Sequence, residues 1–398
     1  MKSILRKKFP GRIFLVVILI GASLVFYWQI NSTKFSATPY QLPDLKFFPR
    51  KVNQIEVNRL TVEGIRLGRF LFYDGRLSGS LHPDSLRSCA SCHIQQKSFT
   101  GEGFQMEKNA TELSSDYQSI KTGSHEVLPL INLIYNRNGF FWNGLINDKN
   151  TNKGPSKGLR YQSLEDVVWI SIESKDCMGG SIDQTVDLIS SIELYQPMFK
   201  KAFGTEKVSI ERIDKAIAQF LRSIIAFRFK LYGVLNGEKK FEPDELRGYE
   251  LFHSEKAGCF HCHAGSLLMT TNEYYNNGLM MDSLDSRDRF LFTNYLKDKG
   301  AYRAPSLINC EITGPYMHDG RYKSLDEVLD FYSEGIQYTD FTDPLIKGAI
   351  EGGIKLTRTE KNDLKAFLLT LTDRSILADT SFSAPIELGI YSIRHSSL

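Results

Sequence analysis

The sequence predicts a mainly α-helical protein made of two similar halves in tandem, joined and covered by long loops. Three observations predict this fold class. A Cys-x-x-Cys-His motif occurs twice, at residues 89–93 and 259–263. Similar sequence blocks flank both copies in the same order. Apolar residues recur at helical spacing between the halves, over residues 210–235.

Composition restricts the class of protein. The chain has 398 residues, of which 42% are hydrophobic and 24% charged, so it can bury a core and fits two or three domains. The formal net charge is +3, and five of the positive charges lie within residues 1–12. The remainder carries 44 basic against 46 acidic residues. This balance argues against a nucleic-acid-binding protein, which carries a strong basic excess.

The N-terminus predicts an export segment. Basic residues precede an uncharged run over residues 13–33, whose apolar core spans residues 13–28. This pattern is typical of a signal peptide or a short membrane anchor, and the positive-inside rule places the rest of the chain outside the cytoplasm. We assign residues 1–34 to this segment. We expect a periplasmic protein that is either cleaved or anchored to the inner membrane through residues 13–30.

The duplicated motif carries the strongest functional signal. Its members are Cys89, Cys92 and His93, then Cys259, Cys262 and His263. Cys-x-x-Cys-His is the attachment motif of c-type haem, in which two thiols add to the vinyl groups and the adjacent His becomes the proximal iron ligand. A zinc site needs four ligands in one closed set, and simple disulfides are a third interpretation. We predict two covalently bound haem c groups.

Further blocks extend the duplication. Gly68-Arg-Phe-Leu-Phe72 precedes the first motif, and Gly248-Tyr-Glu-Leu-Phe252 precedes the second. A Pro/Asn block, an aromatic block that ends in Asn-Gly or Asp-Gly, and a Ser-Leu-acid-acid-Val block follow each motif. Trp142 in the first copy matches His318 in the second. The sequence therefore predicts two copies of one mono-haem cytochrome domain.

The predicted organisation follows from these blocks. We expect a linker over residues 35–55, a first haem domain over 56–235, a second over 236–375 and a C-terminal tail over 376–398. Ser163 and Ser324, each followed by acidic residues, predict helix N-caps. Further helices are expected over residues 62–72, 210–235 and 245–252, and from Thr357 or Thr359 to Leu371. Loops are expected over residues 136–160 and 272–300.

The motif order resembles that of bacterial di-haem cytochrome c peroxidases and the related MauG-type enzymes. The resemblance covers about residues 56–373 and includes the Phe-Phe-Trp-x-Gly and Pro-Tyr-Met-His-Asp-Gly blocks. It implies two cytochrome c-like domains, a peroxide-reactive haem in the first half and a six-coordinate haem in the second. It also implies that electrons come from a small reduced cytochrome c or cupredoxin. Whether the protein forms a homodimer stays open at this point.

The resemblance assigns roles to further residues. Trp142 matches a Trp that lies between the two haems, with an ordinary core aromatic as the alternative. Thr313 and Pro315 match residues whose carbonyl groups bind a calcium ion. The family's Asn ligand has no clear counterpart, although Glu126 lies nearby in the sequence.

The distal ligand of the second haem departs from the peroxidase pattern. The peroxidases place a Met fourteen residues after the His of the Pro-Tyr-Met-His-Asp-Gly block, and Tyr332 stands there in this chain. MauG-type enzymes have an axial Tyr on this haem. We therefore predict Tyr332 as an iron ligand. The alternative is a packed aromatic at Tyr332, with Met280 or Met281 as the ligand.

The first haem site departs as well. The peroxidases hold a Gln and a Glu ten residues apart on its distal side, and these positions are Val167 and Cys177 here. Cleavage of peroxide needs a group that moves a proton between its oxygens, which Val cannot do and Cys does at the risk of oxidation. Glu173 or Asp176 could substitute. We predict Trp142, Cys177 and Glu173 as catalytic residues.

Two histidines and two cysteines leave alternatives open. His125 and His82 are candidates for a distal ligand of the first haem, and ordinary loop positions are the alternative. If neither binds iron, the first haem is five-coordinate at rest. Cys177 and Cys310 lie outside the haem motifs, and a disulfide between them is compatible with an oxidising compartment.

These residues predict a periplasmic di-haem cytochrome c peroxidase that reduces hydrogen peroxide with electrons from a small carrier. Two alternatives remain. Tyr332 favours a MauG-like di-haem oxidase that acts on a protein side chain. The missing acid–base pair leaves a non-catalytic di-haem electron-transfer protein open.

Overall fold

The structure is a computed structural model. It describes residues 35–53, 58–82, 86–101, 125–137, 139–144, 163–174, 177–265, 267–279 and 288–392. The predicted export segment, residues 1–34, lies outside these ranges. Within them, no helix is long and apolar enough to cross a membrane. Residues Thr38–Leu398 form one compact unit.

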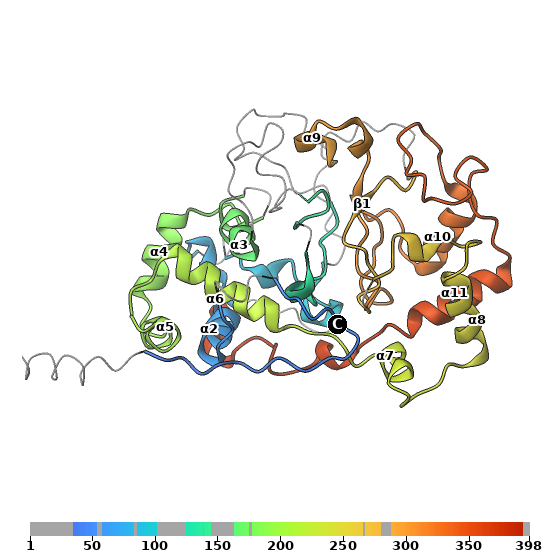
Figure 1. Cartoon of the computed structure of the whole chain (residues 1–398). Helices are drawn as coiled ribbons and strands as arrows, with labels where there is room; N and C mark the ends of the chain where they lie inside the picture. The colour runs from blue at the N-terminus through green and yellow to red at the C-terminus, as the bar shows by residue number, and fades with distance from the viewer. Residues whose placement is uncertain are drawn as a thin grey trace, which may run out of the picture. The chain divides into compact units, whose positions relative to one another are not determined.

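Two packed helix pairs form the framework of the two halves (Figure 1). In the first half, α2 (Val62–Tyr73) packs against α6 (Ile210–Ser223). In the second half, α8 (Pro243–Phe252) packs against α11 (Arg358–Leu369). The structure thus confirms three of the predicted helices, those over residues 62–72 and 245–252 and the last one, and it has a shorter helix within residues 210–235. The protein is mainly helical, as the sequence predicted.

One glycine in each pair lets the two helix backbones approach closely. A Cβ atom at Gly68 would lie 1.9 Å from the carbonyl oxygen of Ala216, and a Cβ atom at Gly248 would lie 1.9 Å from that of Asp363. Both distances are far below van der Waals contact, so no larger residue fits without moving the partner helix. The two Gly-x-x-Leu-Phe blocks therefore mark equivalent helix crossings.

Two further helices begin at the predicted caps. The Ser163 side chain accepts a hydrogen bond from the Asp166 backbone at the start of α3 (Leu164–Glu173), and the Ser324 side chain accepts one from Glu327 at the start of α10 (Leu325–Asp330). The caps are therefore confirmed. α10 continues into a π-turn over Phe331–Gly335, a feature that is frequent at functional sites.

The single helix predicted over residues 210–235 is wrong. The chain leaves the helical conformation after α6 and enters α7 (Lys230–Leu235) only later. Backbone N–H groups of residues 226–228 donate to side-chain oxygens of Asn132 and Asp373 at 2.8–3.0 Å. These remote acceptors satisfy the backbone, so the segment runs extended between the halves.

The other elements are short. They are α4 (Ile182–Ser191), α5 (Tyr195–Phe203), α9 (Phe290–Thr293) and an antiparallel pair of strands, β1 (Tyr274–Tyr275) and β2 (Tyr302–Arg303). Short 3-10 turns occur at Gly75–Ser78, Cys89–Ser91, Gln95–Lys97, Leu133–Tyr135, Cys259–His261, Leu296–Asp298, Ser375–Leu377 and Ile386–Tyr391. The predicted loop over 272–300 therefore contains a strand and a helix.

A buried ion pair fixes α3 against α6. The Arg222 guanidinium is fully buried and donates to both carboxylate oxygens of Glu165, at 2.6 and 2.9 Å. Asn58 donates to the same carboxylate at 2.7 Å. A paired and hydrogen-bonded buried charge specifies one arrangement because breaking the pair leaves an uncompensated charge. The pair therefore sets where α3 lies.

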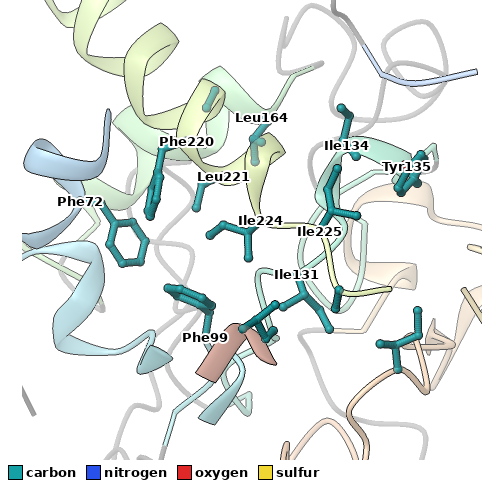
Figure 2. Packing of buried hydrophobic residues seen from close by; sticks show 14 of the residues in the cluster. Phe72, Phe99, Ile131, Ile134, Tyr135, Leu164, Phe220, Leu221, Ile224 and Ile225 are labelled. Atoms are coloured by element: carbon teal, nitrogen blue, oxygen red, sulfur yellow. The ribbon is translucent and has the colours of Figure 1, made fainter. Parts of the chain in front are cut away.

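Apolar side chains from α2, α3, α6 and the intervening loops pack together in the first half (Figure 2). The Phe72 ring contacts the rings of Phe99 and Phe220, with centroids 6.0 and 5.2 Å apart. Leu221 and Ile224 lie in the same cluster and continue it beyond the end of α6.

The C-terminal segment returns to the first half. Side chains of Arg69, Tyr73 and Gln95 donate to backbone carbonyl groups of residues 376–382 at 2.8–3.0 Å. The described part of the predicted tail is therefore packed against α2, although it follows the second half in sequence.

The helix crossings generate a first prediction. Replacing Gly68 or Gly248 with alanine should lower the free energy of unfolding by roughly 2 kcal/mol or more, because the added Cβ forces the helices apart. Gly233→Ala is the matched control: its Cβ would meet only the movable Lys239 side chain, so stability should change by less than about 1 kcal/mol. Denaturant unfolding measures all three. Equal stability of Gly68→Ala and the control would contradict the close crossing.

Candidate functional site

Each Cys-x-x-Cys-His motif lies in the wall of its own cavity. A first cavity of about 690 Å³ is lined by Cys89, Cys92 and His93. A second cavity of about 210 Å³ is lined by the corresponding residues Cys259, Cys262 and His263. Most of the remaining lining is apolar in both cavities.

The two histidines are held in the same way. Nδ1 of His93 lies 2.8 Å from the Phe99 carbonyl oxygen, and Nδ1 of His263 lies 3.2 Å from that of Met269. A carbonyl only accepts, so Nδ1 carries the hydrogen and Nε2 keeps its lone pair. Burial lowers the pKa of both imidazoles to about 4, which keeps them neutral. A neutral, oriented imidazole is the form that ligates iron.

The cysteines fit the same cofactor. Burial raises the pKa of Cys89 and Cys259 to about 12, so both thiols are protonated. Among the described residues, no three His, Cys, Asp or Glu side chains gather as in a metal cluster. An apolar cavity with two thiols and one oriented imidazole thus fits a covalently bound haem.

Trp142 lies in the wall that the two cavities share. It lines both of them, together with Arg303 and Pro305. Its indole N–H donates to the Glu126 carbonyl at 2.7 Å, and its own carbonyl accepts from the Arg303 backbone at 2.7 Å. The side chain is 9% exposed. One hydrogen bond from the indole and one to the backbone carbonyl therefore fix Trp142 in the wall common to the two cavities.

A second aromatic contact joins the cavities beside Trp142. His318 lines the second cavity and stacks on Tyr302, with ring centroids 3.8 Å apart. His125 lines the first cavity, and its ring lies 5.5 Å from the His318 ring and 5.3 Å from the Tyr302 ring. The sequence analysis did not identify Tyr302, because its role depends on pairing with residues far along the chain.

Tyr332 lies inside the second cavity. Burial raises the pKa of its phenol to about 12, and Asn277 donates a hydrogen bond to the phenol oxygen at 3.2 Å. Tyr332 is the second residue of the π-turn Phe331–Gly335, which directly follows α10. The alternative ligands Met280 and Met281 lie outside the described residues.

The predicted catalytic residues of the first site separate in space. Val167 and Cys177 line the first cavity. Glu173 is exposed and is not among its lining residues. Asp176 lies outside the described residues. Cys177 therefore lines the first cavity, whereas Glu173 does not.

The remaining candidates also separate. His125 lines the first cavity, whereas His82 is exposed and does not. All six cysteines are thiols, and Cys177 and Cys310 line different cavities.

Asn277 and Ser171 are among the polar cavity residues that the sequence alone did not identify. Asn277 was missed because nothing local links it to Tyr332. Ser171 lines the first cavity. A signal for it exists in the duplication, because Ser171 follows Ser163 by as many residues as Tyr332 follows Ser324.

Glu126 lies close to one of the predicted calcium residues. A Cβ atom at Gly320 would lie 2.7 Å from Oε2 of Glu126 and 3.3 Å from a ring carbon of Pro315. Oε1 of Glu126 is buried and has no hydrogen-bond partner within the described ranges. Burial raises the pKa of this carboxyl above its ordinary value. A bound cation would compensate such a carboxylate.

Comparisons with known proteins identify the family of this chain. The family described as di-haem cytochrome c peroxidase matches residues 62–240. The methylamine utilization protein MauG of Methylorubrum extorquens is 29% identical over 325 residues, which cover 81% of this chain and 82% of MauG. Cytochrome c551 peroxidase of Nitrosomonas europaea is 28% identical over 77% of this chain and 79% of its own length.

A solved structure extends the likeness to the fold. It is a MauG-like protein associated with microbial copper homeostasis, which is 30% identical and aligns with a TM-score of 0.70. The alignment covers 88% of this chain and 99% of that chain. With two separate haem-type cavities and matching relatives over most of its length, the chain belongs to the di-haem cytochrome c peroxidase and MauG family.

Proposed function

We propose that this protein is a di-haem peroxidase that reduces hydrogen peroxide to water, H2O2 + 2 e⁻ + 2 H⁺ → 2 H2O, with electrons from a small reduced cytochrome c or cupredoxin. The observation that carries the proposal is the placement of Trp142 in the wall common to both cavities. A peroxide-reducing site and an electron-accepting site need a path for electrons between them, and an aromatic side chain in the common wall supports such a path.

Two covalently bound haem c groups complete the sites. Cys89 and Cys92 would hold the first, Cys259 and Cys262 the second, and the adjacent His93 and His263 would bind the iron. When bound, the first haem supplies two-electron chemistry on peroxide and the second accepts single electrons from the donor. The backbone carbonyls behind the histidines orient Nε2 toward the iron position.

The first cavity supplies little proton chemistry of its own. Val167 is apolar, and the exposed Glu173 does not line the cavity. Cys177 is the thiol in the lining, and we propose it as a proton-transfer residue. A thiol beside peroxide is oxidised to a sulfenic acid, so turnover should decline as peroxide accumulates.

Residues 1–34 support export to the periplasm, where small soluble electron carriers would have access to the protein. We propose that the segment is cleaved or retained as an anchor through residues 13–30. N-terminal sequencing of the protein from separate periplasmic and membrane fractions decides between the two, and recovery of the protein only in the cytoplasm would contradict export.

A second candidate function is a MauG-like oxidase of a protein side chain. Tyr332 favours it because an anionic phenolate stabilises oxidised iron, and Asn277 donates a hydrogen bond to the phenol oxygen. The two functions share the sites and differ in which partner supplies electrons, a small carrier or an oxidisable protein.

The peroxidase proposal predicts the behaviour of a Trp142→Phe variant. A pyridine haemochrome assay first establishes that the protein carries two haems. When this protein is mixed with peroxide and a reduced small cytochrome c, it should oxidise the cytochrome catalytically. Trp142→Phe should slow this turnover by about tenfold or more, because the residue between the sites is lost. Stopped-flow absorbance measures both rates.

Trp169→Phe is the control for this variant, because Trp169 lies on α3 but outside the cavity lining. Full activity of Trp142→Phe would show that Trp142 is not needed for electron transfer between the two sites. Absence of donor oxidation by the unaltered protein would overturn the peroxidase proposal.

The Tyr332 assignment predicts a change of potential. Tyr332→Met should raise the reduction potential of the second haem and shift its ferric spectrum, because a thioether favours the reduced iron that a phenolate disfavours. Tyr322→Phe is the control, since Tyr322 packs nearby without lining the cavity. Spectroelectrochemical titration follows both haems, and identical titrations of Tyr332→Met and the unaltered protein would refute the ligand.

We also propose a calcium ion near Thr313 and Pro315, with Glu126 as its anionic ligand. Glu126→Ala should bind less calcium and melt at a lower temperature, because the carboxylate no longer holds the ion. The control is Glu351→Ala on the exposed surface. Elemental analysis and melting curves with and without a chelator give the answer, and equal calcium content in both variants would contradict the site.

A further inference from the structure

The two halves present equivalent helices to their cavities. α3 and α10 each begin after a Ser cap, and the cap oxygen accepts from the backbone three residues later at 3.3 and 3.2 Å. In both halves the same four positions line the cavity, at one, four, five and eight residues after the cap. They are Leu164, Val167, Val168 and Ser171 in α3, and Leu325, Val328 and Leu329 in α10 with Tyr332 in the π-turn that follows it.

The correspondence places Ser171 where the second half has Tyr332. Four of four lining positions agree, so the two helices meet their cavities with the same face. If the Tyr332 phenol reaches the iron in the second half, then the Ser171 hydroxyl faces the iron position of the first half. The shorter side chain leaves a gap between this hydroxyl and the iron position. A serine is shorter than a tyrosine by the whole phenol ring.

The hydroxyl of Ser171 is oriented. Its Oγ lies 2.8 Å from the Val167 carbonyl oxygen and donates its hydrogen there. The lone pairs of Oγ therefore stay available to accept a hydrogen bond from another molecule. The other three lining positions of α3 are apolar, so this helix offers one polar contact to the cavity.

We propose that Ser171 is the distal residue of the first site, and that its hydroxyl oxygen accepts a hydrogen bond from an O–H group of the peroxide bound there. This inference rests on the proposed function, because it assumes a haem in the first cavity. Ser171 orients peroxide and exchanges no net proton, since a serine hydroxyl does not ionise near neutral pH. It differs from the predicted Cys177 and Glu173 in acting by position alone.

The decisive experiment exchanges the residues between the halves. The oxidised holoprotein is titrated with cyanide, which binds iron only where the distal position is open. We expect about one equivalent for the unaltered protein, none for Ser171→Tyr, and about two for Tyr332→Ser. The loss of one equivalent in Ser171→Tyr tests the assignment whether or not Tyr332 is a ligand. The titration involves no turnover, so its outcome is independent of the peroxidase proposal.

Unchanged cyanide stoichiometry in Ser171→Tyr, with both haems attached, overturns the inference. Smaller variants keep the proposal testable if the tyrosine disturbs folding. Ser171→Ala should lower the bimolecular rate constant for peroxide by about 3- to 10-fold, the loss of one neutral hydrogen bond. Its cyanide association should change less than about twofold, because bound cyanide has no hydrogen to donate. Ser171→Thr should restore the peroxide rate.

Ser190→Ala is the matched control. Ser190 on α4 donates to the carbonyl of Val186 at 2.6 Å, the same bond within a helix turn, but it lies outside the cavity lining. Equal effects of Ser171→Ala and Ser190→Ala would assign the loss to helix structure and overturn the distal role.

Discussion

The hydrogen bond behind each motif histidine is the constraint on which both sites depend. Nδ1 of His93 and of His263 is bonded to the carbonyl of the residue six positions later, so each short loop closes on its own ring. The bond fixes which ring nitrogen faces the cavity and keeps the imidazole from rotating. The helix crossings at Gly68 and Gly248, the apolar lining and the distal helices are arranged around two imidazoles held in this manner.

The parts of the structure that the sequence predicted are those set by neighbours in the chain. The motif spacing, the caps at Ser163 and Ser324, and the helices that contain Gly68 and Gly248 depend on contacts within a few residues or on repeated patterns. The break after α6 was not predictable, because its backbone is satisfied by Asn132 and Asp373, which lie far away in sequence.

The distal side of the first site shows the same limit. Glu173 was predicted there on its chemistry and its nearness to Cys177. A helix turns by about 100° per residue, so Glu173 lies roughly 200° around α3 from Ser171. Ser171 faces the cavity, which sends Glu173 to the solvent. Helix phase, which is readable from the matching copy, was a better guide than residue chemistry.

The duplication gives one scaffold two different sites. The caps, the crossings and the histidine loops are kept in both halves, and the differences lie in a few side chains that face the cavities. Trp142 in the first half occupies the position of His318 in the second, and Ser171 occupies the position of Tyr332. A shared framework thus carries different side chains at equivalent positions of the two cavities.

The C-terminal segment has a consequence for how the protein is made. Residues 376–382 supply carbonyl groups to Arg69, Tyr73 and Gln95, the last of which lies just after the first motif. Because the chain is synthesised from its N-terminus, the donors Arg69, Tyr73 and Gln95 are made hundreds of residues before the carbonyl groups of residues 376–382 that accept their hydrogen bonds. The first half therefore completes its surface last, after the second half has been produced, and a nascent or truncated chain leaves the flank of α2 uncovered.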